Sequence, residues 1–224
     1  MDRKHKLGKL GKAFITIVVG EGDEQEEFTI HEALATQRSR FFRNCMKGNW
    51  KEAEDRVVKL PKEEPAIFEL YVQSLYAGHV SNQDDTSPPF PKLGKIFALA
   101  HMLQDTEARN TATKEIFAKI ERVVVPSYAI PPADFFDMIT SVWETSDKDA
   151  PIRRLLVDTF KSYNMLASYG KAEKEQIIAC FEKVPADFHA RVTWEFMARY
   201  RKTQWLGEDL NDVSQYLEKV ESEK

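Results

Sequence analysis

Apolar and polar residues alternate with the two-residue period of a β-strand near the start of the chain. Residues 14–20, FITIVVG, are β-branched or aromatic and end at a turn rich in glycine and acid. A second alternating run, EEFTIH, follows at residues 26–31. The two runs predict a β-hairpin, and RVVKLP at residues 56–61 predicts a further short strand that a proline ends.

After residue 31 the apolar residues recur every three or four positions, which is the spacing of a helix buried on one face. Ser39 lies shortly before the apolar residues between 41 and 46, and a serine at that place can cap a separate short helix. We therefore expect two short helices, with a break near Gln37 or Arg38, rather than one long helix.

Three longer helices are predicted between residues 65 and 120. Pro65 suits the first turn of the first helix and Gly78 suits its end. A proline-rich loop at residues 81–91 separates it from the second helix, and the third begins near Asp105. The apolar stripes of the three helices are Ile67, Tyr71 and Leu75; then Leu93, Ile96, Phe97, Ala100 and Leu103; then Ile116 and Ile120.

Every segment beyond residue 125 has a helical pattern. Its stripes are Ile152, Leu155, Leu156, Thr159, Phe160 and Tyr163; Ile177, Ile178, Phe181 and Val184; Phe188, Val192, Phe196 and Tyr200; and Leu210, Val213, Leu217 and Val220. We therefore predict an α+β fold class: a small sheet capped by helices over residues 12–122, followed by an all-helical C-terminal extension over residues 126–220.

Composition and charge narrow the classes of partner. Of the 224 residues, 32 are Lys or Arg and 36 are Asp or Glu, and the net charge of −4 argues against a surface built for phosphates. Cations and aromatic rings interleave only around residues 199–202, between Trp194 and Trp205. These two tryptophans can stack on bases or pack into a core; we favour the core, and we expect no nucleic acid partner.

The cysteine usage and the hydropathy indicate a protein of the cell interior, in the cytoplasm, the nucleus or both. Cys45 and Cys180 have no neighbouring Cys or His at metal-ligand spacing, and the chain contains no glycosylation sequon. The apolar run Ala13–Val19 is far shorter than the roughly 20 residues that a membrane span requires. We expect no membrane association.

Catalytic patterns are missing from the sequence. Five scattered histidines form no zinc motif, and the GKLGKAF segment lacks the hydroxyl residue that a phosphate loop needs. Cys45 lies on an apolar helical face, where burial raises a thiol pKa. Paired carboxylates such as Glu63–Glu64 and Asp84–Asp85 are interpreted as solvated loop charge. We expect no catalytic residue, no metal and no cofactor.

Five segments in order resemble the BTB/POZ domain, and in particular the short BTB proteins of filamentous fungi. They are FITIVVG, EEFTIHEAL, QRSRFF, KGNWKEAEDRVVKLP and PAIFELYVQSLYAGHV. The segment LGKIFALAHMLQDTEARNTATKEI looks like the helical close of that domain, so the resemblance covers about residues 12–122. VWETSDKDAPIRRLLVDTF, further along, is similar to the region after the domain in such fungal proteins.

The resemblance implies a non-catalytic protein–protein interaction module, commonly a homodimer and often an adaptor that recruits clients to a cullin-based ubiquitin ligase. His31 corresponds to the junction histidine of the family, and we interpret it as a buried hydrogen-bonding residue. Members that bind corepressors often carry an aspartate before the first strand and a basic residue after this histidine. Here those places hold Ala13 or Phe14, and Glu32, so a groove of that kind is not expected.

Trp50 and Glu52 are the candidate cullin-binding residues. Cullin-binding BTB domains present an apolar residue, any residue and then Glu in the loop after the serine-capped helix, where this chain has Trp50-Lys51-Glu52. An exposed Trp50 can bury a large area in a partner, while Glu52 meets a basic group at the rim. Alternatively Trp50 folds back onto its own helix, and the sequence leaves both possibilities open.

Leu7, Leu10, Phe14 and Ile15 are the candidate dimer-interface residues, because the resemblance implies a two-fold contact at the first strand. Gly8 and Gly11 interrupt the segment before that strand and make it a poor helix. The leading hypothesis is a homodimeric cullin adaptor. The alternative is a homotypic scaffold or regulatory protein that binds no cullin, and an enzyme is the third possibility.

Overall fold

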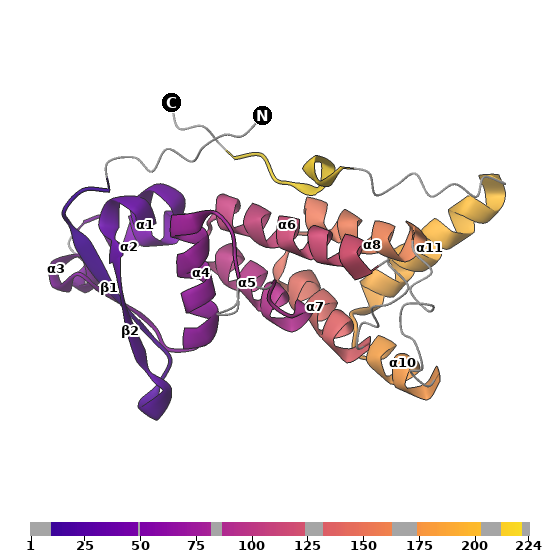
Figure 1. The fold of residues 1–224 in the computed structure, drawn as a ribbon, viewed down its shortest axis with the longest axis horizontal. Helices are drawn as coiled ribbons and strands as arrows, with labels where there is room; N and C mark the ends of the chain where they lie inside the picture. The colour runs from indigo at the N-terminus through magenta and orange to yellow at the C-terminus, as the bar shows by residue number, and fades with distance from the viewer. Residues whose placement is uncertain are drawn as a thin grey trace. The chain divides into compact units, whose positions relative to one another are not determined.

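The described strands all lie in the N-terminal part of the chain, and the described elements after β3 are all helices (Figure 1). The structure is a computed structural model that describes residues 10–48, 50–81, 87–123, 132–162, 174–202 and 212–220. The elements are β1 (Phe14–Val19), the 3₁₀ helix η1 (Gly22–Glu24), β2 (Glu26–His31), α1 (Glu32–Arg38), α2 (Arg40–Cys45), α3 (Lys51–Asp55), β3 (Val57–Leu60), α4 (Pro65–Ala77), α5 (Phe90–Met102), α6 (Thr106–Val123), α7 (Pro132–Thr145), α8 (Pro151–Ser162), α10 (Lys174–Phe181), α11 (Ala186–Lys202) and the 3₁₀ helix η2 (Val213–Tyr216).

The sheet has three strands in the order β2-β1-β3. β1 and β2 pair antiparallel, with Phe14 opposite His31, which confirms the predicted hairpin. β3 pairs parallel to the other edge of β1, with Thr16 opposite Val57. Gly20 ends β1 at φ +85°, and a Cβ there would lie 2.9 Å from the Glu24 carbonyl oxygen. The hairpin turn therefore requires glycine at this position.

Ser39 separates the two short helices α1 and α2, as the sequence predicts. Its Oγ accepts a hydrogen bond from the Phe42 amide at 3.1 Å and donates one to the Leu103 carbonyl at 2.6 Å. The hydroxyl thus caps α2 and also joins it to the end of α5. Because Ser39 is buried, both of its hydrogen-bonding roles are satisfied inside the protein.

Helix α4 packs against the sheet and is delimited as predicted. Pro65 occupies its first turn, and Gly78 ends it in the left-handed conformation at φ +72°. The expected stripe of Ile67, Tyr71 and Leu75 is buried. Phe68 on the same helix lies 5.0 Å, centroid to centroid, from Phe28 of β2, so aromatic packing joins the helix to the sheet.

Asp105 is a fully buried carboxylate with several partners. It accepts hydrogen bonds from the Ala108 amide at 2.9 Å and from the Tyr71 hydroxyl at 3.1 Å. The Arg38 guanidinium pairs with it at 3.2 Å. Burial and the Asp105 charge raise the pKa of Tyr71 well above its usual value, so Tyr71 stays a donor. The buried charge is therefore compensated, and it fixes the start of α6.

The chain divides into two compact units. The first consists of Met1–Ser87, Leu99–Thr111 and Val220–Lys224, and the second consists of Pro88–Ala98 and Ala112–Lys219. Aromatic rings build the core of the second unit: the Phe136 and Phe181 centroids are 4.5 Å apart, and those of Trp143 and Phe188 are 5.0 Å apart. The predicted α+β module with a helical C-terminal region is confirmed.

Gly94 allows α5 and α7 to approach closely within the second unit. A Cβ at this position would lie 3.0 Å from Met138 Cα and 3.2 Å from the Met138 carbonyl oxygen. Both neighbours are backbone atoms of α7, which cannot move without moving the helix. Gly94 is therefore a packing glycine rather than a helix end.

Arg153 joins α7, α8 and α11 from a nearly buried position. Its guanidinium donates to the Ser146 hydroxyl at 2.9 Å and to the Asp187 carboxylate at 3.3 Å. It also donates to the Trp143 carbonyl and lies 4.5 Å from the centre of the Trp143 ring. Burial lowers the pKa of Arg153 from its ordinary value, and Asp187 acts in the opposite direction.

Several expectations for the C-terminal region are wrong, among them the stripe positions Ile178 and Phe196, whose side chains are 44 % and 48 % exposed. The stripe that includes Val213, Leu217 and Val220 predicts a helix, but residues 213–216 form only the short 3₁₀ helix η2, whose buried side chain is Tyr216. The core position expected for Trp194 is also wrong, since its side chain is 66 % exposed. Phe188 and Val192 supply the buried face of α11, and Trp194 points elsewhere because helical residues two apart do not share a face.

Candidate functional site

Trp50 stands at the N-cap of the five-residue helix α3. Its carbonyl oxygen accepts hydrogen bonds from the amides of Ala53 at 3.0 Å and Glu54 at 3.2 Å. These bonds fix the Trp50 backbone and leave its side chain outside the helix. The indole lies beside Gly48, where an added Cβ would be 3.6 Å from Trp50 Cδ1. Gly48 thus leaves room for the ring.

The Trp50 side chain is 67 % exposed, so it is not part of the core of this chain. The sequence leaves open whether Trp50 is a solvent-facing side chain or packs against its own helix, and the structure has the exposed arrangement. An exposed indole at a helix start offers apolar area that a partner could cover. Its role in binding a partner stays a prediction.

Glu52 follows Trp50 by two residues and is exposed. Its carboxylate acts on the Cys45 thiol, since burial raises the pKa of Cys45 and the negative charge of Glu52 raises it further. The end of α2 and the start of α3 therefore lie close enough to interact electrostatically. The expected rise in the pKa of Cys45 is confirmed, but sequence spacing does not reveal the contribution of Glu52.

Arg56 ends α3 in the left-handed conformation, at φ 58°, and its guanidinium pairs with the carboxylate of Glu32. Glu32 is half-buried and directly follows the junction residue His31. Here it serves an ion pair at the base of the α3 segment. The two residues are 24 positions apart, and no local sequence signal joins them.

The four candidate dimer-interface residues have different environments. Leu7 lies outside the described residues, and Leu10 is half-buried. Phe14 is 47 % exposed at the start of β1, whereas Ile15 is 1 % exposed and belongs to the core. The alternation of the strand places Phe14 and Ile15 on opposite faces, so Phe14 and Leu10 are the ones left to face a partner.

His31 holds the junction of β2 and α1 through Tyr76. The Tyr76 hydroxyl lies 2.8 Å from His31 Nδ1 and accepts a hydrogen bond from the His31 amide at 3.0 Å. The exposed ring of Phe14 packs on the imidazole with centroids 4.5 Å apart. The hydrogen-bonding role expected for His31 is confirmed, but the residue is half-buried rather than buried.

The interpretation of the paired carboxylates Glu63 and Glu64 as solvated loop charge is wrong for Glu63. Glu63 is half-buried, and the pKa of its carboxyl is raised, first by burial and then by the neighbouring charge of Glu64. No apolar pattern surrounds it in sequence, because the burial comes from the fold of the turn after β3. Asp84 and Asp85 lie outside the described residues.

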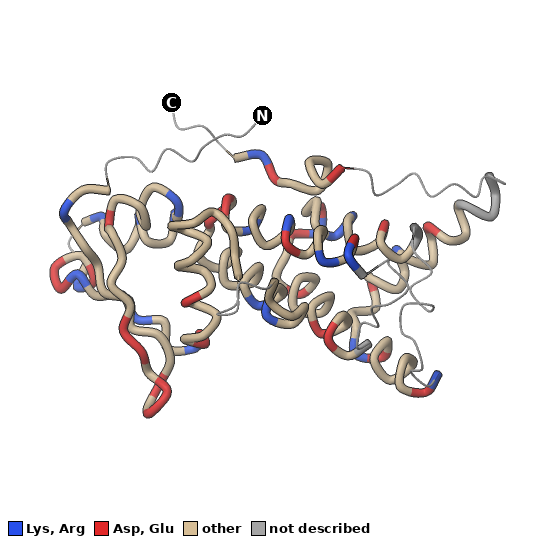
Figure 2. The backbone as a smooth tube through the Cα atoms, viewed as in Figure 1, with Lys and Arg blue, Asp and Glu red and all other residues tan. Residues whose placement is uncertain are grey.

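Carboxylates gather at the turn between β1 and β2 (Figure 2). The exposed acidic residues of this hairpin end are Glu21, Asp23, Glu24, Glu26 and Glu27. β2 is an edge strand, and charges at its start oppose the addition of a further strand there.

Neither a metal centre nor a membrane span occurs in the part of the chain that the structure describes. Its residues include no group of three or more His, Cys, Asp or Glu placed to hold a metal ion. Among the described helices, none is both long enough and apolar enough to cross a membrane.

Comparison with known proteins gives the family of the N-terminal part. Residues 13–117 match the family model of the BTB/POZ domain. Residues 13–117 thus form a BTB/POZ domain, which is just under half of the chain. BTB domains are typically protein–protein interaction modules, so the family match suggests a function of this kind for the domain.

The Kelch repeat and BTB domain-containing protein 4 of Mus musculus is similar to this chain, with 28 % identity over 112 residues. The proteins of the same name from Pongo abelii and Homo sapiens are 27 % identical over 112 residues. In each case the match covers 46 % of this chain and 21 % of the relative. The similarity thus spans about a fifth of the length of these relatives.

Proposed function

We propose that this chain is a non-enzymatic adaptor whose BTB domain links a client protein to a cullin-type ubiquitin ligase. The observation that carries the proposal is the exposed Trp50 at the start of α3, followed by the exposed Glu52. This is the apolar–any–Glu order that the family resemblance associates with cullin binding.

The local geometry supports the role of Trp50 as an anchor. Two backbone hydrogen bonds hold its carbonyl, so little conformational freedom of the backbone remains to be lost on binding. Large aromatic side chains dominate the energetics of protein interfaces when a partner pocket covers them. Glu52 lies at the rim of such a contact, where its charge favours a basic partner surface.

Copurification from a cell lysate tests the proposal. The tagged full chain is expected to retain a cullin, and Trp50→Ala is expected to lose it with an unchanged melting temperature, because the side chain is exposed. Trp194→Ala is the matched control, since Trp194 is equally exposed on α11. Equal cullin recovery with Trp50→Ala and wild type would contradict the proposal.

A homotypic scaffold is the second candidate, favoured by the exposed Phe14 at the start of β1. An exposed aromatic ring suits a two-fold contact in which the same surface meets itself, and the half-buried Leu10 precedes it by four residues. In this case the chain self-associates without binding a cullin.

Light scattering of the full chain at tens of micromolar tests self-association. We expect a dimer mass for the wild type and a monomer mass for Phe14→Glu, because the new charge would be buried in the contact. Ile178→Glu serves as the control, because Ile178 is similarly exposed but lies on α10. A monomeric wild type at this concentration would remove the dimer from the proposal.

The proposal extends to the organisation of the chain. The BTB/POZ domain is assigned to residues 12–122, and the helical extension over residues 126–220 is proposed to hold the client. The expected site of action is inside the cell, in the cytoplasm, the nucleus or both. We also propose that the chain is related to the short BTB proteins of filamentous fungi.

A further inference from the structure

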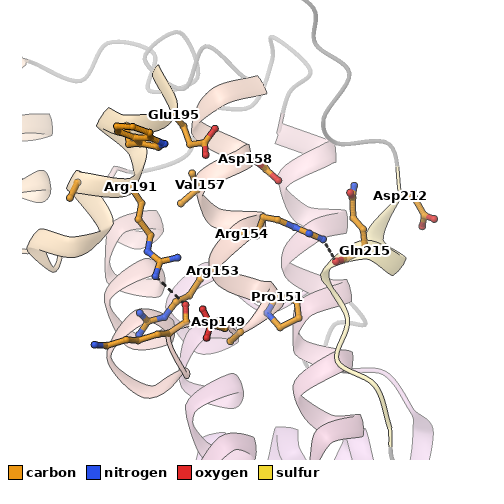
Figure 3. A pocket seen from close by; sticks show the side chains of 14 residues that line it. Asp149, Pro151, Arg153, Arg154, Val157, Asp158, Arg191, Glu195, Asp212 and Gln215 are labelled. Carbon is orange, nitrogen blue, oxygen red and sulfur yellow. Dashed lines mark hydrogen bonds between the residues drawn. The ribbon is translucent and has the colours of Figure 1, made fainter. Parts of the chain in front are cut away.

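An open groove of about 1140 Å³ crosses the second unit along α8 (Figure 3). Val157 of α8 lies on its floor, and Arg154 reaches across it toward Gln215. Ala190 and Trp194 of α11 line one side, and Gln215 lines the side formed by the η2 segment. The groove is thus bounded by three elements of a single compact unit.

Helix α11 carries a second apolar stripe that leads into this groove. Ala190, Trp194 and Met197 follow one another at intervals of four and three residues, which places them along one face of the helix. Trp194 is 66 % exposed and Met197 is 61 % exposed, whereas Phe188 and Val192 on the opposite face pack into the core. The stripe has the spacing that receives another helix.

Two arginines are held beside the apolar floor. The Arg154 guanidinium donates to the Gln215 carbonyl and lies 5.4 Å from the centre of the Tyr216 ring. The Arg191 guanidinium donates to the Lys148 carbonyl at 3.3 Å and lies 5.8 Å from the centre of the Trp143 ring. A guanidinium has five N–H donors, so one carbonyl bond orients each group without exhausting it.

The charges of the groove are unevenly distributed. Lys148 and Asp149 directly precede α8 in the chain, and the side chains of Arg154 and Arg191 lie toward the N-terminal end of that helix (Figure 3). Arg153 also lines the groove, but its guanidinium serves the buried network with Ser146 and Asp187.

The other carboxylates lie further along or serve local bonds. Glu195 and Asp158 lie toward the C-terminal end of α8, and Asp158 accepts from the Tyr216 hydroxyl. Asp212 accepts from the Ser214 amide and caps η2. One end of the groove therefore favours a negatively charged ligand group.

We propose that this groove binds an amphipathic helix of a partner protein, with acidic residues at the end that lies over Arg154 and Arg191. The apolar face of the bound helix covers Trp194, Met197 and Val157, and its carboxylates accept from the two guanidinium groups. The length of the α11 stripe, two turns, matches apolar residues at positions i, i+3 or i+4, and i+7 of the partner helix. The site does not depend on cullin binding through Trp50.

Selection from a displayed library of random 16-residue peptides tests the proposal. The full-length wild type is the target, and Trp194→Ala is used to remove peptides that bind elsewhere. We expect enriched sequences with apolar residues at helical spacing and with Asp or Glu concentrated at one end. Absence of any Trp194-dependent sequence, or enrichment of basic sequences, would overturn the proposal.

A synthetic peptide taken from the selection then tests the arginines by fluorescence anisotropy. We expect Arg154→Gln with Arg191→Gln to weaken binding at least tenfold, with the deficit shrinking as salt rises from about 0.05 to 0.5 M. Arg40→Gln, an exposed arginine of α2, should bind like the wild type. Equal affinity of the double variant and the wild type would refute the acidic ligand.

Two measurements on Trp194→Ala separate a lost groove contact from misfolding and from self-association. Its melting temperature should match that of the wild type, which shows that lost binding is not lost folding. If light scattering shows a wild-type dimer that Trp194→Ala dissociates, a second copy of the chain occupies the groove and the proposal of a separate partner is wrong. Retained cullin binding in the same variant separates this result from a failure of the proposed function.

Discussion

At the scale of single residues, exposure distinguishes side chains that sequence patterns treat alike. Trp50 sits among charged residues and Trp194 sits in a helix with a strong apolar pattern, yet both are largely exposed. Because charged residues surround Trp50 in the sequence, an exposed side chain is one of the two arrangements that the sequence allows, and packing against its own helix is the other. The exposure of Trp194 is not foreseeable, because periodicity gives the faces of a helix but not which face finds a partner.

The Cys45 thiol offers a measurement of the geometry around Glu52. In a Cys180→Ser background, the pH at which Cys45 reaches half its maximal alkylation rate by iodoacetamide should lie above that of a free cysteine, because burial and Glu52 both raise its pKa. Glu52→Gln should lower this midpoint, but the midpoint should stay above that of a free cysteine because burial still raises the pKa of Cys45.

Glu54→Gln is the control for the thiol measurement, because Glu54 lies in the same short helix and is not among the groups that shift Cys45. Identical midpoints for Glu52→Gln and the parent would show that the α3 segment does not lie beside the end of α2. That result would also remove the fixed position of Glu52 from the proposed binding site.

Glu63 gives a prediction for the pH dependence of stability. Its pKa is raised in the folded protein, so the folded state binds the proton more tightly than the unfolded chain does. Protonation of Glu63 therefore stabilises the folded state. This stabilisation is complete at pH values below the pKa of a glutamate in the unfolded chain, about 4.3, and it is lost as the pH rises through the pKa of Glu63 in the folded protein. Glu63→Gln should therefore raise the free energy of unfolding at pH 7.

Urea unfolding at several pH values checks this sign. The difference between Glu63→Gln and the wild type should shrink toward zero near pH 3, where the glutamate is protonated in both states. Glu26→Gln is the control, because Glu26 is exposed. At pH 7 its free energy of unfolding should differ less from that of the wild type than the value for Glu63→Gln does. A Glu63→Gln variant that is less stable than wild type at neutral pH would contradict the environment described for this carboxyl.

At the scale of elements, short sequence patterns predict the strands and the helix ends that depend on neighbouring residues. The strands at residues 14–19 and 26–31, the cap at Ser39 and the limits of α4 follow from β-branched runs, a hydroxyl at a helix start, and Pro65 and Gly78 at the two ends. The parallel pairing of β3 with β1, by contrast, depends on a chain reversal through α1 to α3 that has no short-range signal.

The C-terminal elements show the limit of periodicity. Val213, Leu217 and Val220 have helical spacing, but Asp212 caps a short 3₁₀ turn and Tyr216 provides the buried contact, with its hydroxyl 3.2 Å from Asp158. A side chain that packs 58 positions away along the chain cannot be found from the spacing of its neighbours. The buried network of Arg153 escapes sequence patterns for the same reason.

Gly94 yields a prediction at the contact of two helices. Gly94→Ala should destabilise the protein, although alanine favours a helix by up to about 1 kcal/mol over glycine. The added methyl meets Met138 backbone atoms at 3.0 and 3.2 Å, and overpacking of this kind typically costs about 1–3 kcal/mol.

Thermal unfolding measures the effect of Gly94→Ala. The melting temperature should fall by a few degrees relative to wild type. Lys92→Ala on the exposed side of the same helix is the control and should change it little. A higher melting temperature for Gly94→Ala would show that α5 and α7 do not meet at this glycine.

At the scale of the whole chain, the BTB/POZ domain and the helical C-terminal region place two exposed tryptophans on different compact units. The fold class is predictable because the order of several local segments carries it. The partners are not, since exposure and charge show that a surface is available but do not name what covers it.

The proposed function depends on Trp50 as the residue that would anchor a cullin. Titration calorimetry of the purified full chain with a purified cullin tests it most directly, with wild type and Trp50→Ala compared at equal folding stability. We expect measurable binding by the wild type and a loss of about 2 kcal/mol, roughly thirtyfold in affinity, for Trp50→Ala at an unchanged melting temperature. The proposal would be contradicted by a stable Trp50→Ala variant that binds the cullin as tightly as the wild type, or by a wild type that binds no cullin.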